Sequence, residues 1–98
     1  MNKILVLGAG GMLGYAVSEY FKSKNYNVTE LTRAEFDIAK DEVAKLEEFV
    51  KSNDVVINCA GVIKPRINAM SVEDVLMVNS VFPRNLAKLC NKLDKKCF

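Results

Sequence analysis

Near its N-terminus the chain reads Lys3-Ile4-Leu5-Val6-Leu7-Gly8-Ala9-Gly10-Gly11-Met12-Leu13-Gly14, an unbroken apolar run followed at once by a glycine-rich turn. A continuous apolar run is typical of a parallel strand that is buried on both faces. Glycines behind such a strand let the backbone turn sharply and approach a pyrophosphate, toward which the next helix directs the positive end of its dipole. The sequence therefore predicts a dinucleotide-binding strand, turn and helix, with a contact set of Gly8, Gly10, Gly11, Met12, Leu13 and Gly14.

The spacing of the glycines indicates which type of dinucleotide-binding turn this is. Gly8, Gly11 and Gly14 give G-x-x-G-x-x-G, and counting Gly10 instead of Gly11 gives G-x-G-x-x-x-G. Both differ from the G-x-G-x-x-G of ordinary dehydrogenases and resemble the pattern of short-chain dehydrogenases/reductases. A plain tight turn is the alternative, which the flanking strand and helix disfavour. We expect the helix to bury one apolar stripe, formed by Leu13, Ala16, Val17, Tyr20 and Phe21. Gly14 is expected on the same face, where it permits close packing on the strand.

Length and composition describe one small domain over residues 1–98. The 98 residues are 50% hydrophobic and 27% charged, as is ordinary for an α/β protein. Lys and Arg number 14 against 12 acidic residues, so the net charge of +2 gives no reason to expect a nucleic acid or an anionic membrane as partner. The first apolar run has only five residues, too few for a signal peptide or a spanning helix. We expect a cytoplasmic protein.

The cysteines give no sign of a metal site. Cys59, Cys90 and Cys97 are an odd number, form no C-x-x-C motif, and the chain has no histidine. The sequence therefore favours neither a zinc site nor a disulfide bond, and each cysteine lies in an apolar segment. We expect no metal and treat the thiols as small buried hydrophobes.

Strands alternate with helices along the rest of the chain. Further strands are predicted at residues 26–32, 36–38 (very short), 54–60 and, incompletely, 95–98. Asn25 is expected to end the first helix, and Asp41 and Ser71, the latter with Asp74, to cap two more. Residues 61–68 are predicted to be a loop, because Pro65 disfavours a helix there. The fold class is α/β, a Rossmann-type doubly wound parallel sheet of order 3-2-1-4-5, truncated at the fifth strand.

The end of the second strand distinguishes the two nicotinamide cofactors. A carboxylate at this place bonds the ribose 2′-hydroxyl of NAD, whereas an arginine receives the 2′-phosphate of NADP. The sequence has Arg33 there, and Glu30 is too early and falls within the strand. This favours NADP, with NAD as the alternative cofactor. The other interpretation of Arg33 is a solvated surface charge.

Three further groups of residues are candidates for the site. Asp37 with Ile38 could contact adenine, although Asp37 could equally be a turn residue. Cys59, Ala60 and Gly61 end a buried strand in small side chains that allow close backbone approach, or simply end a strand at a glycine. Pro83 has no N–H, so the carbonyl of Asn79 would lose its helical partner and bind a water; a break between two short helices is the alternative.

Taken together, these residues resemble the N-terminal half of an extended short-chain dehydrogenase/reductase. The segments Cys59–Arg66 and Asn79–Ala87 are most similar to the dTDP-4-dehydrorhamnose reductase group of sugar-nucleotide-modifying enzymes. The resemblance implies an NADP-dependent reductase of a nucleotide-linked keto sugar, with a homodimer as one assembly. It also implies that the glycines hold the pyrophosphate, Arg33 the adenosine phosphate, Asp37 and Ile38 the adenine, Cys59–Gly61 the ribose, and that Asn79 orders a water of the proton relay.

The chemistry of such an enzyme needs a Ser or Thr and a Tyr-x-x-x-Lys that have no counterpart at the corresponding places here. Tyr20–Lys24 matches Tyr-x-x-x-Lys but lies at the far end of the first helix, so we assign it to packing and predict no catalytic residue. We expect the chain to be the cofactor-binding fragment of a larger reductase. A non-catalytic dinucleotide or sugar-nucleotide module, or an epimerase or dehydratase of the same fold, are the alternatives. Lys64 and Arg66 are either solvated charges or contacts to a substrate phosphate.

Overall fold

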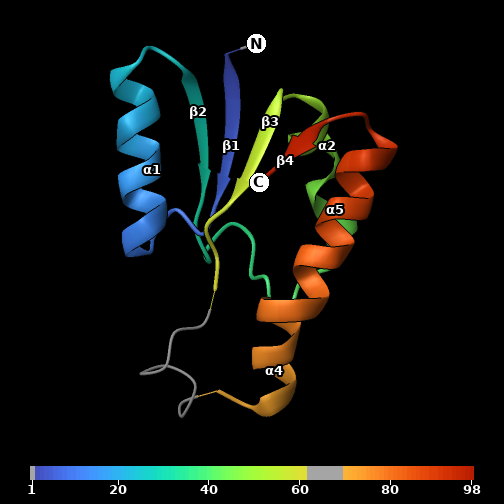
Figure 1. Cartoon of the computed structure of the whole chain (residues 1–98). Coiled ribbons are helices and arrows are strands. Elements are labelled where there is room, and N and C mark those ends of the chain that lie inside the picture. The colour runs from blue at the N-terminus through green and yellow to red at the C-terminus, as the bar shows by residue number, and fades with distance from the viewer. Residues whose placement is uncertain (1, 62–69) are drawn as a thin grey trace.

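Four parallel strands form the centre of the molecule in residues 2–61 and 70–98, the part of the chain that this computed structural model describes. The strands are β1 (Lys3–Leu7), β2 (Asn27–Leu31), β3 (Val55–Asn58) and β4 (Lys96–Cys97). They are arranged in the order β2-β1-β3-β4 (Figure 1). In the register, Leu5 of β1 lies opposite Thr29 of β2 and Val56 of β3. The incomplete last strand is confirmed, since β4 pairs in parallel with β3.

Helices cover both faces of this sheet. They are α1 (Met12–Ser23), the 3₁₀ turn η1 (Val43–Leu46) with α2 (Glu47–Lys51), and a continuous run of α4 (Val72–Leu76), the π-helical turn η2 (Met77–Val81) and α5 (Phe82–Lys92). In Figure 1, α1 lies on one side of the strands, and α2 with α5 lies on the other. Asn25 has the left-handed φ of 68° that commonly follows a helix, as predicted. The fold is therefore Rossmann-like.

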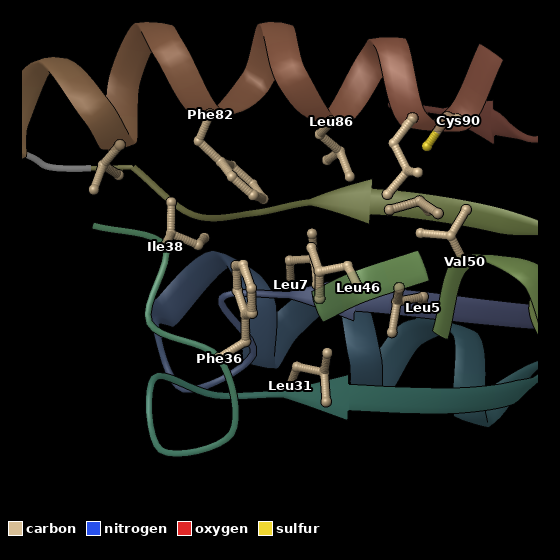
Figure 2. Packing of buried hydrophobic residues seen from close by; sticks show 13 residues of the cluster. Leu5, Leu7, Leu31, Phe36, Ile38, Leu46, Val50, Phe82, Leu86 and Cys90 are labelled. Atoms are coloured by element: carbon tan, nitrogen blue, oxygen red, sulfur yellow. The ribbon is translucent and has the colours of Figure 1, made fainter. Parts of the chain in front are cut away.

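The core has two parts because side chains of a strand alternate between faces. Ile4 and Val6 face α1, where Val17 and Phe21 pack against them. Leu5 and Leu7 face the opposite way and join the larger cluster. Figure 2 shows this second cluster, with Phe82, Leu86 and Cys90 of α5 directed toward Leu5, Leu7, Leu46 and Val50. The sheet is thus packed on both faces, against α1 on one side and against α2 and α5 on the other, which fixes the position of the carboxyl ends of its strands.

The very short third strand predicted at residues 36–38 is wrong. The Asp37 N–H donates to the Asp41 carboxylate (2.8 Å) and the Asp37 carbonyl accepts from the N–H of Asp41 (2.7 Å), so this backbone closes a turn. Phe36 and Ile38 are buried, and the Phe36 ring lies 5.8 Å from that of Phe82. Their alternation reflects insertion into the core rather than pairing with a strand. Without that strand, the predicted order 2-1-4-5 corresponds to β2-β1-β3-β4.

The apolar stripe predicted for α1 is only partly buried. Gly14 and Ser18 are buried, and Val17 and Phe21 are half-buried, whereas Leu13, Ala16 and Tyr20 are exposed. The cause is the close approach at Gly14. A Cβ there would overlap the Gly8 carbonyl oxygen and lie 2.8 Å from the Ala9 Cα. This contact turns the helix so that positions 14, 18 and 21 face the sheet.

Two predicted helix signals have different outcomes. Ser71 is the N-cap of α4, and its hydroxyl accepts from the Asp74 N–H (3.1 Å), as expected. Asp41 is not a cap, because η1 begins after Glu42 and the Asp41 carboxylate instead accepts from Asp37 and pairs with Lys45 (3.3 Å). The local sequence cannot distinguish these two uses of an aspartate.

Pro83 does not divide its helical segment. The Phe82 N–H donates to the Met77 carbonyl, five residues back, so the continuous run accommodates Pro83 through a π turn. The alternative of a break between two short helices is therefore wrong, and the predicted irregularity before Pro83 takes the form of a π turn. In residues 2–61 and 70–98, no helix is long and apolar enough to cross a membrane. The loop predicted for residues 61–68 and the charges of Lys64 and Arg66 fall outside the described residues, Gly61 excepted.

Candidate functional site

A cavity of about 530 Å³ lies beyond the carboxyl ends of β1, β2 and β3. It brings together three predicted segments, namely the glycine turn, the residues that follow β2 and the end of β3. Nine of the thirteen predicted site residues line it, which are Gly8, Gly10, Gly11, Arg33, Asp37, Ile38, Cys59, Ala60 and Gly61. In parallel α/β sheets this edge is where ligands bind.

The glycines of the turn serve two different purposes. Gly8 has a φ of 73°, and a Cβ on it would lie 2.8 Å from the Ala60 N. Gly8 and Gly14 are therefore required by the packing of the protein itself. A Cβ on Gly11 would meet only the Gly8 carbonyl oxygen, at 3.6 Å, and one on Gly10 only the Thr32 side chain, at 3.6 Å. The small size of Gly10 and Gly11 keeps the cavity open rather than the fold intact.

The backbone donors of this turn are not all available to a ligand. The N–H groups of Gly8 and Ala9 both donate to the Leu31 carbonyl (3.1 Å each), and that of Gly11 donates to Gly8 (3.2 Å). The first hydrogen bond of α1 runs from Tyr15 N–H to the Gly11 carbonyl (2.9 Å). The amides of residues 12–14 precede it, and α1 has no side-chain cap and no acidic residue in its first turn. The Gly10 N–H likewise has no acceptor among the described residues, so the donors that can meet an anion are the amides of Gly10, Met12, Leu13 and Gly14.

The side chains of Met12 and Leu13 point to solvent, at 91% and 62% exposure, and do not line the cavity. Their predicted contact with a ligand could therefore come only from the backbone. This is consistent with the physical reason for the motif, which depends on peptide N–H groups rather than on side chains.

Both carboxylates near the end of β2 have partners that keep them from Arg33. Glu35 accepts from the Thr32 N–H (2.8 Å) and hydroxyl (2.7 Å), and these hydrogen bonds lower the pKa of its carboxyl. Glu30 lies within β2, as predicted, and pairs with Lys22 of α1 (3.1 Å). Arg33 is exposed and forms no ion pair within residues 2–61 and 70–98. The guanidinium is therefore open to an anionic ligand.

Asp37 acts as a turn residue and also lines the cavity. Its Oδ1 accepts from the Ala39 N–H (3.0 Å), which is the turn interpretation of this aspartate. Ile38 is buried at 9% exposure and contributes an apolar wall beside it. The contact of either residue with adenine stays a prediction.

A salt bridge at this cavity escaped the sequence analysis. Lys40 and Asp74, 34 residues apart, both line the cavity, and the Lys40 Nζ lies 3.0 Å from an Asp74 carboxylate oxygen. The hydrogen bond to Asp74 raises the pKa of Lys40. No local pattern could have revealed this contact, because it depends on how α4 is placed. The other lining residues that were not predicted are Thr32, Ala34, Phe36, Ala39, Met70 and Val78.

The end of β3 is fastened by its own hydrogen bonds. The Cys59 N–H donates to the Leu7 carbonyl (2.9 Å), and the Ala60 N–H donates to Asn58 Oδ1 (3.1 Å). Burial raises the pKa of the Cys59 thiol, so the group is uncharged at neutral pH. The backbone of residues 59–61 is thus held at the cavity wall with small side chains, as the sequence predicted.

Asn79 lies beside this wall without lining the cavity. A Cβ on Gly61 would lie 3.8 Å from Asn79 Oδ1, so η2 places the side chain near the end of β3. Asn79 takes part in an interaction within the structure. The water expected at its carbonyl remains a prediction.

The Tyr-x-x-x-Lys match at Tyr20–Lys24 lies away from the cavity. Lys24 Nζ lies 5.7 Å from the centre of the Tyr20 ring, which packs edge-on against Phe21 at 5.2 Å. Neither residue lines the cavity. Among the described residues there is no group of three or more Cys, Asp or Glu side chains that could hold a metal ion.

The chain is similar in sequence to dTDP-4-dehydrorhamnose reductase of Mycolicibacterium smegmatis. The two are 36% identical over 93 residues, which cover 95% of this chain and 28% of the relative. The chain therefore spans less than a third of the length of this curated protein.

Solved structures of proteins with that activity in their descriptions share the fold. The dTDP-4-dehydrorhamnose reductase from Bacillus anthracis, in complex with NADP, matches with a TM-score of 0.80 at 19% identity, over 98% of this chain and 34% of that one. The Clostridium acetobutylicum structure matches with a TM-score of 0.78 at 28% identity, over 97% and 34%. Residues 1–97 match the family described as the RmlD substrate binding domain, and the chain therefore belongs to that family of dTDP-4-dehydrorhamnose reductase homologues, as the resemblance predicted.

Proposed function

We propose that this chain binds NADP(H) in the 530 Å³ cavity and forms the cofactor-binding part of a reductase that acts on a nucleotide-linked keto sugar. One observation carries the proposal. Residues predicted separately from three segments of the sequence line a single cavity at the ligand-binding edge of the sheet. Membership of the RmlD family and the NADP in the related Bacillus anthracis structure support the choice of ligand.

The pyrophosphate would lie at the start of α1. The amides of Met12, Leu13 and Gly14 precede the first helical hydrogen bond, and the positive end of the helix dipole adds to their attraction for an anion. Gly10 and Gly11 leave room for the phosphates, since neither has a Cβ and neither position is filled by the protein. These groups would bind both NADP and NAD, because the two share the pyrophosphate.

Arg33 would select the phosphorylated cofactor. A guanidinium binds a phosphate through paired charge-assisted hydrogen bonds. An NAD site at this place uses a free carboxylate, whereas Glu35 is engaged by Thr32 and Glu30 by Lys22. The neighbourhood of Arg33 therefore suits a 2′-phosphate better than a 2′-hydroxyl.

The remaining residues would orient the cofactor. Ile38 offers an apolar wall for adenine and Asp37 an acceptor for its amino group, while residues 59–61 let the backbone approach the second ribose. When bound, NADPH supplies the hydride for a sugar carbonyl. The chain itself would hold and orient the dinucleotide, and we assign it no proton transfer, because Tyr20 and Lys24 lie outside the cavity.

Titration calorimetry with NADPH and NADH tests the proposal. Wild-type chain should bind NADPH more tightly than NADH. Arg33→Ala should weaken NADPH binding by about ten- to a hundredfold, the size expected for losing charge-assisted hydrogen bonds, and leave NADH binding unchanged.

Arg84→Ala is the matched control, because Arg84 is exposed on α5 and does not line the cavity. This variant loses the same charge and should bind NADPH like the wild type. Equal losses for NADPH and NADH in Arg33→Ala would show that Arg33 does not read the 2′-phosphate. A wild-type chain that binds neither dinucleotide would refute the proposed function.

A further inference from the structure

The turn that carries Arg33 is closed by a reciprocal set of hydrogen bonds. The Thr32 N–H and hydroxyl donate to the two oxygens of Glu35 (2.8 and 2.7 Å). In return, the N–H groups of Glu35 and Phe36 donate to the Thr32 carbonyl (3.1 and 3.0 Å). The bond from the Thr32 N–H to Glu35 is one half of a capping box of the form Thr-x-x-Glu. In place of the other half, the Glu35 N–H bonds the Thr32 carbonyl, and the Thr32 hydroxyl oxygen accepts from the Ala34 N–H (3.3 Å). We call this modified set of hydrogen bonds, which closes a single turn, the capping box.

Both ends of this turn are anchored in the molecule. On one side, Leu31 is buried and its carbonyl accepts from the N–H groups of the glycine turn. On the other side, Phe36 is buried against Phe82 (5.8 Å between ring centres). Arg33 and Ala34 form the exposed tip between these anchors, and both line the cavity. The capping box therefore determines how the tip is presented to the cavity.

The capping box also controls the charge of this site. Glu35 is only two residues from Arg33, yet both of its oxygens are directed to Thr32. Arg33 has no carboxylate partner in the described part of the chain. A Glu35 released from Thr32 could pair with the guanidinium and compete with an anionic ligand.

We infer that Glu35 is a positioning residue, which fixes the turn so that Arg33 faces the cavity and thereby sets the preference for a 2′-phosphorylated dinucleotide. This inference rests on the proposed function and adds the residue that orients its cation. Glu35 acts through Thr32 and Arg33, so it is not expected to touch the ligand.

Glu35→Ala separates positioning from simple electrostatics, because the two effects have opposite signs. Removing a negative charge beside a phosphate site would by itself tighten NADPH binding. Loss of positioning should instead raise the Kd for NADPH about fivefold, the size of one capping interaction, and leave the Kd for NADH unchanged. Glu35→Gln should lie between wild type and Glu35→Ala, since its amide oxygen can still accept one of the two hydrogen bonds.

Two further variants complete the calorimetric test. Thr32→Val keeps the N–H but loses the hydroxyl, and should weaken NADPH binding in the same direction. Glu30→Gln is the matched control, because it removes a carboxylate from β2 that pairs with Lys22 (3.1 Å) and does not line the cavity. It should bind both dinucleotides like the wild type.

Unchanged or tighter NADPH binding by Glu35→Ala would overturn the inference, as would an equal loss for NADPH and NADH. The proposed function would survive either result, provided that the wild type binds NADPH. A wild-type chain that binds neither dinucleotide would remove the proposed function and the inference together. If Glu35→Ala does not fold, Glu35→Gln and Thr32→Val test the inference instead. In each, the Kd for NADPH should rise while the Kd for NADH stays unchanged.

Discussion

At the scale of single residues, the glycine turn shows that one motif contains two kinds of position. Gly8 and Gly14 lack room for a Cβ, since backbone atoms lie within 2.8 Å of where it would be. Gly10 and Gly11 have that room. The sequence predicts that all four belong to the site, but it cannot separate positions that serve packing from positions that serve a ligand. That difference depends on residues such as Ala60, far along the chain.

Gly11→Val should therefore fold and lose NADPH binding. The backbone at Gly11 is extended (φ −84°, ψ 172°), which valine adopts readily, and only the cavity would receive the added side chain. Gly14→Val should instead lose more than about 2 kcal/mol of unfolding free energy, because the new side chain meets backbone. Urea unfolding and calorimetry with NADPH measure the two effects.

Ala16→Val provides the control for these variants, since it adds the same side chain to an exposed position of α1. It should keep both stability and binding close to those of the wild type. Gly11→Val with unchanged NADPH affinity would contradict the assignment of the turn, and a stable Gly14→Val would contradict the packing argument.

At the scale of elements, the parts that could be predicted are those with local signals. Asn25 ends α1 and Ser71 caps α4, because a left-handed residue and a hydroxyl acceptor each act on their own neighbours. The strand predicted at residues 36–38 is wrong because the burial of Phe36 depends on a distant contact. The stripe predicted for α1 is only partly buried, because a close backbone approach within the glycine motif itself sets the rotation of the helix. Phe36 packs against Phe82, and the contact between Gly14 and Gly8 sets which face of α1 lies against the sheet.

The cap at Ser71 offers a prediction for α4. Ser71→Ala removes the acceptor of the Asp74 N–H (3.1 Å) and should destabilise this short helix by about 1 kcal/mol. Amide hydrogen exchange of residues 74–76 should accelerate about fivefold, while that of β1 stays as slow as in the wild type. Ser71→Thr retains a hydroxyl and serves as the control. Equal exchange in both variants would show that the hydroxyl does not hold the helix.

At the scale of the whole molecule, the parallel order and the two-layer core follow from the alternation of strands and helices, which the sequence displays. The position of α4 does not, because it depends on the π turn and on the salt bridge between Lys40 and Asp74. The cavity wall formed by Asp74 and Val78 could therefore not be predicted. The glycine turn, the residues after β2 and the end of β3, which form the other walls, could be predicted. The sequence predicts the sheet edge where a ligand binds, but not how that edge is enclosed.

The stability of the molecule should decrease in alkali. Burial is the main cause that raises the pKa of the Cys90 thiol from 9.0 to about 12. The unfolded chain releases this proton near its ordinary pKa and the folded chain holds it, so the free energy of unfolding falls as the pH rises from 9.0 to about 12. The slope for one proton is about 1.4 kcal/mol per pH unit.

Urea unfolding between pH 8 and about 11 measures this effect. Cys90→Ala should start from a lower stability, because it leaves a cavity in the core, but should show a flatter dependence on pH. A part of the slope should remain, because burial also raises the pKa values of the Cys59 and Cys97 thiols. Hydrogen bonds to carboxylates that are lost on unfolding likewise raise the pKa values of Lys22 and Lys40. Identical slopes for wild type and Cys90→Ala would refute the assignment to this thiol.

The π turn of η2 changes the direction in which the side chains of α4, the helix before it, point relative to those of α5. An α-helix rotates by about 100° per residue, and a turn closed over five residues contains one residue more than an α-helical turn. The azimuth of α4 is thereby offset by roughly 100° from the one that an uninterrupted α-helix would impose. Phe82, Leu86 and Cys90 can therefore remain directed toward the sheet (Figure 2). At the same time Asp74 of α4 lies 3.0 Å from the Lys40 Nζ. Shortening residues 77–81 by one would cancel this phase shift and carry Asp74 away from the cavity mouth.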